Sequence, residues 1–197
     1  MNLGNLKFFY AFSCFCLGLL LLSPTLAIII KLPEPERFSQ IWILGSDHTT
    51  ENYPYNVRAN EAYRVYVNVR NHMGGLEYYM VYVKFRNQTE PLPNATARIA
   101  SPLPPLYEYR FLLEHGQSFE APLTFSFRGI SFFNGYCFVE NVTVNDLEFG
   151  IDKLVLWNVN STSYESQFFF ELWMFNAESR TFEYQNMFVT MWLNMTG

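Results

Sequence analysis

From Phe8 to Ile30 the chain carries no charged residue, and this apolar run constrains what the rest of the protein can be. At about 1.5 Å of rise per residue, a helix of this length would reach roughly 34 Å, which is enough to cross a bilayer. Pro24 lies inside the run, and membranes tolerate a helical proline better than water does. We therefore expect an N-terminal transmembrane anchor at residues 1–30, a linker at 31–37 and a folded domain at 38–197.

A cleaved signal peptide is the alternative interpretation of this segment. Thr25-Leu26-Ala27 has the small-x-small pattern of a signal-peptidase site and follows Lys7 and the apolar run. The run continues through Ile28–Ile30, beyond the roughly 7–15 residues of an ordinary signal-peptide core, which favours a retained anchor. The slight excess of positive charge at the N-terminal flank orients the chain with its N-terminus inside. The expected location is the cell membrane, with a single pass and the following domain outside.

Five Asn-x-Thr sequons follow the apolar run, whereas about one would be expected by chance. All of them fall on the side of the run that we expect to be exterior, which favours glycosylation. The alternative is that Asn and Thr are simply common in β turns. The candidate glycosylation sites are Asn87, Asn94, Asn141, Asn160 and Asn194.

Charge and cysteine content exclude some classes of partner and cross-link. Beyond the apolar run there are 18 acidic residues and every basic residue except Lys7, so nucleic acid is not an expected partner. Cys137 is the only cysteine beyond the run, so the domain forms no internal disulfide. Its neighbours Tyr136 and Phe138 favour a buried thiol over a disulfide between chains.

Aromatic residues make up 19% of the chain, and Phe, Tyr and Val gather in short alternating runs separated by Gly, Pro and Asn. This pattern is typical of β-strands. The clearest case is a predicted hairpin over Tyr63–Phe85, turning at Met73-Gly74-Gly75. A three-residue loop would place all the alternating apolar residues on one face. The predicted pairs are Val69 with Tyr79, Val67 with Val81, Val65 with Val83, and Tyr63 with Phe85.

A second predicted hairpin joins residues 167–176 to 181–194. Its register pairs Phe175 with Phe182, Trp173 with Tyr184, and Phe169 with Phe188, and it places Glu171 opposite Asn186. We expect that carboxylate to pair with the amide or with an arginine.

Further strands are expected at 39–44, 106–114 and 118–127, whereas 90–105 holds five of the ten prolines and is predicted to be a loop. Residues 141–163 show no clear pattern. About seven antiparallel strands without a long amphipathic helix indicate an immunoglobulin-like β-sandwich.

Several motifs resemble those of an uncharacterised prokaryotic, largely archaeal, family of predicted membrane proteins. The likeness covers residues 37–197 and lies in RFSQIWILG at 37–45, ENYP at 51–54, NH at 71–72, FELW at 170–173 and WLNMT at 192–196. The resemblance implies an exterior C-terminal domain of unknown function. Because members of that family often have several spans before this domain, no role of a multi-span region is implied here. No catalytic residues are known for the family, so none are carried over.

Binding is the activity that the residues favour. In the predicted hairpin, Tyr66, Tyr78, Met80 and Tyr82 share the face opposite the valines, rimmed by basic residues, as in a contact patch for sugar or protein. The competing interpretation is that another part of the fold covers this face.

The residues do not indicate an enzyme, a metal site or a cofactor. No carboxylate pair can be placed at the spacing that glycoside hydrolysis needs, and the three histidines lack metal-binding spacing. We therefore predict a non-enzymatic, membrane-anchored binding or scaffolding module of the cell envelope, with an envelope protein or glycan as its partner. The alternative is an accessory subunit or enzyme of envelope glycan processing.

Overall fold

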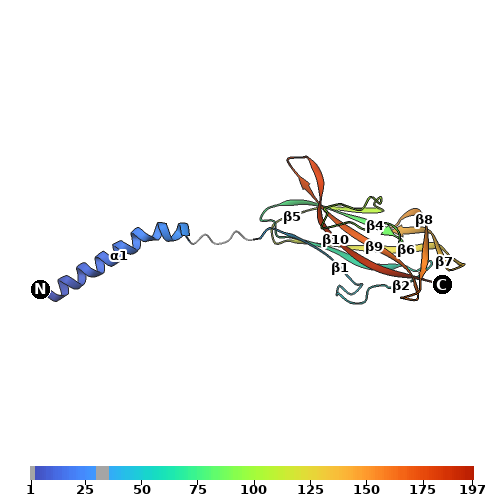
Figure 1. The fold of residues 1–197 in the computed structure, drawn as a ribbon, viewed down its shortest axis with the longest axis horizontal. Helices are drawn as coiled ribbons and strands as arrows, with labels where there is room; N and C mark the ends of the chain where they lie inside the picture. The colour runs from blue at the N-terminus through green and yellow to red at the C-terminus, as the bar shows by residue number, and fades with distance from the viewer. Residues whose placement is uncertain (1–2, 30–35) are drawn as a thin grey trace. The chain divides into compact units, whose positions relative to one another are not determined.

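The computed structural model describes residues 3–29 and 36–197, with side chains at 7–21 and 36–197. Contacts divide the chain into two units, Met1–Glu36 and Arg37–Gly197. The first unit contains helix α1 (Leu3–Ile29), and the second contains all ten strands (Figure 1). Within the residues described, no helix combines the length and the apolar character needed to cross a membrane.

The strands form two layers that belong to one curled sheet. One layer follows the order β1 (Ser39–Leu44), β3 (Tyr63–Asn71), β6 (Ser118–Phe133), β7 (Tyr136–Val144) and β8 (Leu147–Asn158). The other follows β2 (Asn56–Arg58), β10 (Thr181–Thr196), β9 (Ser163–Asn176), β4 (Glu77–Arg86) and β5 (Tyr107–Leu113). A short ladder between the end of β8 and the start of β9 joins the two layers.

The domain has ten strands instead of about seven, and it is not wholly antiparallel, because β10 pairs with β2 in parallel. The additional strands are β2, β7 and β8, and of these β8 and the end of β7 lie in residues 141–163, which sequence patterns left unassigned. Asn134-Gly135 and Asn145-Asp146 turn the chain between β6, β7 and β8, and all four residues have positive φ. Asn-Gly is a strong hairpin signal, and such turns favour residues that tolerate positive φ. The local chemistry of both turns therefore agrees with the observed meander.

The predicted hairpin over Tyr63–Phe85 is wrong, although its alternation is correct. The valines of β3 and the apolar row of β4 are all buried, as expected. However, β3 pairs with β1 and β6, whereas β4 pairs with β5 and β9. The two rows therefore lie in different layers and line one core. Alternation identifies which face of a strand is buried, but it does not distinguish a neighbouring strand from one across the core.

Asn71 organises the crossing from β3 to the other layer. Its Nδ2 donates to the carbonyl oxygens of Gly75, at 2.8 Å, and Leu113, at 2.7 Å, while its Oδ1 accepts from the backbone N–H of Met73. The side chain is fully buried. These bonds satisfy backbone groups at the corner, where no ladder is available to them.

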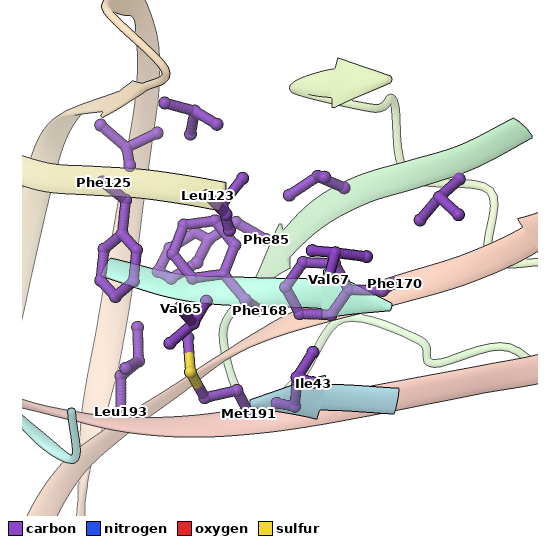
Figure 2. Packing of buried hydrophobic residues seen from close by; sticks show 14 of the residues in the cluster. Ile43, Val65, Val67, Phe85, Leu123, Phe125, Phe168, Phe170, Met191 and Leu193 are labelled. Atoms are coloured by element: carbon purple, nitrogen blue, oxygen red, sulfur yellow. The ribbon is translucent and has the colours of Figure 1, made fainter. Parts of the chain in front are cut away.

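Aromatic rings from both layers meet in the core (Figure 2). The ring of Phe168 on β9 lies 4.9 Å from that of Phe125 on β6 and 5.1 Å from that of Phe85 on β4. The rings are tilted, in the offset arrangements that aromatic pairs prefer. Because β6 and β9 do not pair with each other, this contact holds the two layers together face to face.

The predicted register of the C-terminal hairpin is confirmed near the turn and is wrong farther from it. Phe175 lies opposite Phe182, and Trp173 opposite Tyr184, as predicted. The register then shifts through a bulge, so Phe188 lies opposite Glu171 instead of Phe169. Asn186 lies within the bulge with a φ of 58°. A bulge adds residues to one strand only, which a regular alternating pattern does not reveal.

The inter-layer core yields a first prediction. Phe168→Ala should lower the free energy of unfolding by about 3–5 kcal/mol, since it leaves a cavity between the layers. Phe133→Ala is the control, because Phe133 is 49% exposed, and it should cost roughly 1 kcal/mol or less. Urea unfolding followed by circular dichroism measures both, and equal losses would contradict this description of the core.

Candidate functional site

The predicted contact patch is divided between the two layers. Tyr66 lies on β3, where its ring stacks on His48 at a centroid distance of 3.8 Å. Tyr78, Met80 and Tyr82 lie on β4 in the other layer, and Met80 is only 2% exposed. The four residues therefore do not form one surface, because the hairpin that would join them does not exist. A contact role for the individual residues stays a prediction.

Three strands bring a larger group of aromatic rings together on the outer face of β4, β9 and β10. The ring of Tyr78 lies 5.0 Å from that of Phe182, and the indole of Trp173 lies 5.5 Å from the ring of Tyr82. The Arg110 guanidinium lies 5.5 Å from the centre of the Phe182 ring. All of these rings are partly exposed. We define the aromatic surface as Tyr78, Tyr82, Trp173, Phe175, Phe182 and Tyr184.

Beside the aromatic surface lies a buried ion pair. The Lys84 ammonium lies 2.9 Å from Glu171 Oε2, and the two side chains are 4% and 0% exposed. Lys84 also donates to the Ser101 carbonyl at 2.8 Å, while Glu171 accepts from the Ser101 N–H at 2.7 Å and from the Trp173 indole at 3.2 Å. Both charges are thus hydrogen-bonded as well as paired, which offsets part of the cost of burying them.

The predicted partner of Glu171, Asn186 or an arginine, is therefore wrong. Lys84 reaches the carboxylate because β4 lies beside β9, with Tyr82 directly opposite Glu171. The sequence contained a relevant signal, since Lys84 and Glu171 each interrupt an apolar run, at residues 78–85 and 168–175. Pairing them required the order of strands in the sheet, which the predicted hairpin had misassigned.

Tyr184, a member of the aromatic surface, also has a buried polar group. Its hydroxyl is buried without a hydrogen-bond partner in the described part of the chain. Burial, with a smaller contribution from the negative charge of Glu171, raises the pKa of Tyr184 to about 12. The phenol is therefore neutral at physiological pH and does not serve there as a base.

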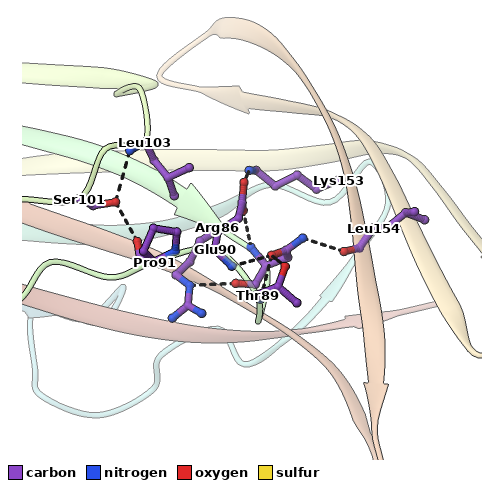
Figure 3. A network of polar contacts seen from close by, with 9 residues as sticks. Arg86, Thr89, Glu90, Pro91, Ser101, Leu103, Lys153 and Leu154 are labelled. Atoms are coloured by element: carbon purple, nitrogen blue, oxygen red, sulfur yellow. Dashed lines mark hydrogen bonds and ion pairs between the residues drawn. The ribbon is translucent and has the colours of Figure 1, made fainter.

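The loop between β4 and β5 is fastened to the sheet where it leaves β4 (Figure 3). The Arg86 guanidinium donates to the carbonyls of Asn87 and Gln88 and to the side chain of Gln167, at 2.6–2.8 Å. Burial lowers the pKa of Arg86. The Glu90 carboxylate accepts from the Asn87 N–H and pairs with Lys153 of β8. Together with the bonds from Ser101 to Lys84 and Glu171, these contacts hold the loop against the outer side of β4 and β9.

The five sequons differ in how accessible their amides are. Asn94 and Asn160 are exposed, and within the described residues their Nδ2 groups make no hydrogen bond. Asn87 Nδ2 donates to the Leu154 carbonyl, and Asn194 Nδ2 donates to the Asn56 side chain, both at 2.9 Å. Asn141 is half-buried in the middle of β7. Asn94 and Asn160 are therefore the sites best placed for modification.

The candidate residues for catalysis or metal binding are dispersed. Glu108 and Glu120 lie in different layers, on β5 and β6. Three glutamates that a glycoside hydrolase could have used have basic partners instead: Glu108 with Arg110 at 2.9 Å, Glu120 with His48 at 2.8 Å and Glu148 with Arg128 at 3.6 Å. Among the residues that the structure describes, no three His, Cys, Asp or Glu side chains are grouped to hold a metal ion. Burial raises the pKa of Cys137 to about 12, so that thiol is not a nucleophile at neutral pH.

Replacing one member of the buried ion pair should destabilise the domain strongly. Lys84→Met leaves the Glu171 charge buried and uncompensated, so the free energy of unfolding should fall by about 3–5 kcal/mol. Lys84→Met combined with Glu171→Leu should recover much of this loss. Arg110→Met breaks the exposed pair with Glu108 and should cost about 1 kcal/mol or less. Urea unfolding compares the three variants, and equal losses in the two single variants would refute the argument.

Comparison with known proteins agrees with the predicted domain of unknown function over part of its extent. Residues 32–129 match the family described as "Domain of unknown function (DUF1616)". The match covers just under half of the chain and ends within β6, whereas the predicted resemblance extended to residue 197. No curated protein matches the chain.

Solved structures similar to the chain share little sequence with it. The CARDB domain of the PF1109 protein from Pyrococcus furiosus, solved with di-metal ions, has 10% identity and a TM-score of 0.39, covering 81% of this chain and 89% of that one. A human seminal-plasma complex of zinc 2-glycoprotein and prolactin inducible protein has 8% identity and a TM-score of 0.39, covering 83% and 99%. A β-glucosidase from Listeria innocua, solved with glucose, has 10% identity and a TM-score of 0.33, covering 82% of this chain but 16% of that one.

Proposed function

We propose that the chain is a membrane-anchored binding or scaffolding module of the cell envelope, with an exterior immunoglobulin-like domain and no catalytic role. The observation that carries the proposal is the order of features in the sequence. An uncharged run at residues 8–30 precedes a domain with five sequons, and two of these sequons have exposed amides that make no hydrogen bond to the described residues. Export explains both the run and the sequons.

The apolar run supports attachment to a membrane. It extends from Phe8 to Ile30 in the sequence, beyond the residues whose side chains the structure describes. On α1 the aromatic and leucine side chains between residues 8 and 21 are at least half exposed within the unit that contains them. A helix that is apolar on all sides needs a nonpolar environment around it, and a bilayer supplies one.

Strand pairing supports the immunoglobulin-like description. In that fold the first two strands and a later one share one layer, and the third strand pairs with the last two in the other layer. Here β1, β3 and β6 are neighbours in one layer, while β4, β9 and β10 are neighbours in the other. The hairpin of β7 and β8 is then an addition between two core strands.

The aromatic surface supports binding. Six partly exposed rings lie on the outer face of β4, β9 and β10, beside a loop that ion pairs and hydrogen bonds hold in place. Rigid aromatic side chains offer contact area at a low cost in conformational entropy, and they suit sugar or protein partners. An enzyme would instead need reactive groups gathered in a cleft. Glu108, Glu120 and Glu148 are each paired with a basic group, and they lie on three different strands.

The intact mass of the protein from the membrane fraction of its native host tests this proposal. We expect a mass that retains residues 1–30 and includes glycan. Asn94→Gln and Asn160→Gln should each lower the glycan mass, because these amides are exposed. Asn194→Gln is the matched control and should leave the glycan unchanged, since its amide is held by Asn56 and Tyr164.

Two results would contradict the proposal in different ways. A mass that begins at Ile28 would indicate a secreted domain without an anchor. An uncut chain without glycan would remove the main support for an exterior location. Digestion of intact cells by an external protease then distinguishes a domain outside the membrane from one inside it, because only an exterior domain is cleaved.

A further inference from the structure

A groove runs along the outer edge of β1, between this strand and the bulge of β10. Its volume is about 770 Å³, and its walls include Gln40, Trp42, Arg70, Ala95 and Phe188. β1 pairs with β3 only, so its other edge faces the groove. The groove is therefore bounded on one side by a strand edge.

One residue of β1, Ile41, presents its main-chain groups to this groove. The His72 N–H donates to the Phe38 carbonyl, so the alternate positions 38, 40, 42 and 44 bond toward β3. The N–H and C=O of Ser39, Ile41 and Ile43 then point the other way. The Tyr53 hydroxyl donates to the Ile43 carbonyl at 2.8 Å and caps that position from within the chain. Ser39 is only 4% exposed, so its main chain is covered, whereas Ile41 is partly exposed and receives no such cap from the described residues.

The sequence of β1 also lacks the residues that usually protect an edge strand. Its six residues, SQIWIL, include no charge, no proline and no bulge. Natural edge strands commonly carry a charged residue, a proline or a bulge, because an unprotected edge pairs with other chains. An uncharged edge beside a groove is thus suited to receive another strand.

The charge of the groove indicates which kind of peptide it would bind. Arg70 lies opposite Gln40 on β3, and its side chain is exposed. No carboxylate among residues 36–197 lies within ion-pair distance of its guanidinium, and no Asp or Glu lines the groove. A guanidinium is well matched to a carboxylate, which it can hold with two parallel hydrogen bonds.

We propose that the groove receives an extended acidic peptide segment of another protein, which bonds to the main chain of Ile41 at the edge of β1 and places a carboxylate against Arg70. Strand addition obtains affinity from main-chain hydrogen bonds and specificity from the side chains that flank them. The cap on Ile43 and the wall formed by the β10 bulge favour a short segment over the full edge of a second domain. This inference rests on the proposed binding role and specifies the class of partner.

Selection of peptides by the full-length chain in detergent micelles tests the proposal. A displayed library of random seven-residue peptides supplies the probes, and fluorescence anisotropy gives the affinity of each enriched peptide. We expect the enriched peptides to contain Asp or Glu. Arg70→Glu should weaken their binding at least tenfold. Arg64→Glu should change it less than twofold, since Arg64 is exposed on the same strand but does not line the groove.

Amide hydrogen exchange distinguishes strand addition from docking of side chains alone. The amide of Ile41 should exchange quickly in the free protein and become protected when an enriched peptide binds. Ile41→Pro removes this donor at a position that does not bond to β3, so it should abolish peptide binding while the domain remains folded.

Four results would overturn the proposal: no peptide is enriched; the enriched peptides bind the Arg70→Glu variant equally well; the amide of Ile41 stays unprotected; or the chain alone forms a dimer that Ile41→Pro abolishes, which would make the occupant a second copy. None of these results affects the membrane and glycan masses that test the proposed function, so the two can fail separately.

Discussion

The packing of Phe125 against Phe168 is the contact on which the rest of the domain depends. These rings come from β6 and β9, which share no backbone hydrogen bonds, and they lie 4.9 Å apart between the layers. Burial of such rings supplies the main driving force for bringing two sheet layers together. Once the layers face each other, every other strand has one buried face and one outer face. The surfaces available for binding are the outer faces and edges that remain.

The buried ion pair depends on this arrangement and also contributes to it. Lys84 and Glu171 lie on the outer side of the second layer, where the Ser101 backbone bonds to both charges. The pair thereby fastens the loop between β4 and β5 over the sheet. A hydrophobic pair of similar size would stabilise the sheet as well, but it would not bind the loop backbone. Burying the two charges costs free energy, but it also fixes the conformation of the loop beside the aromatic surface.

Much of the fold was predictable from local patterns, and the candidate site was not. The strand at 39–44, the loop at 90–105 and the hairpin turn at 177–180 are confirmed, because each depends on residues that are close in the sequence. The predicted pairing of β3 with β4 was wrong. Two buried rows have the same sequence pattern whether their strands are neighbours in one layer or face each other across the core. That error divided the predicted contact patch. It also concealed the pairing of Lys84 with Glu171, which needs β4 beside β9.

By itself, the sequence determined the uncharged N-terminal run, the β class of the domain, the buried face of each clear strand and the positions of the sequons. These are properties of single residues and of short periodic patterns. Only the tertiary structure decided which strands are neighbours, where the β10 bulge lies, which sequon amides are free and that β1 leaves one edge unpaired beside Arg70. Those features join residues far apart in the chain, and they depend on how two layers pack across a shared core, which no local pattern encodes.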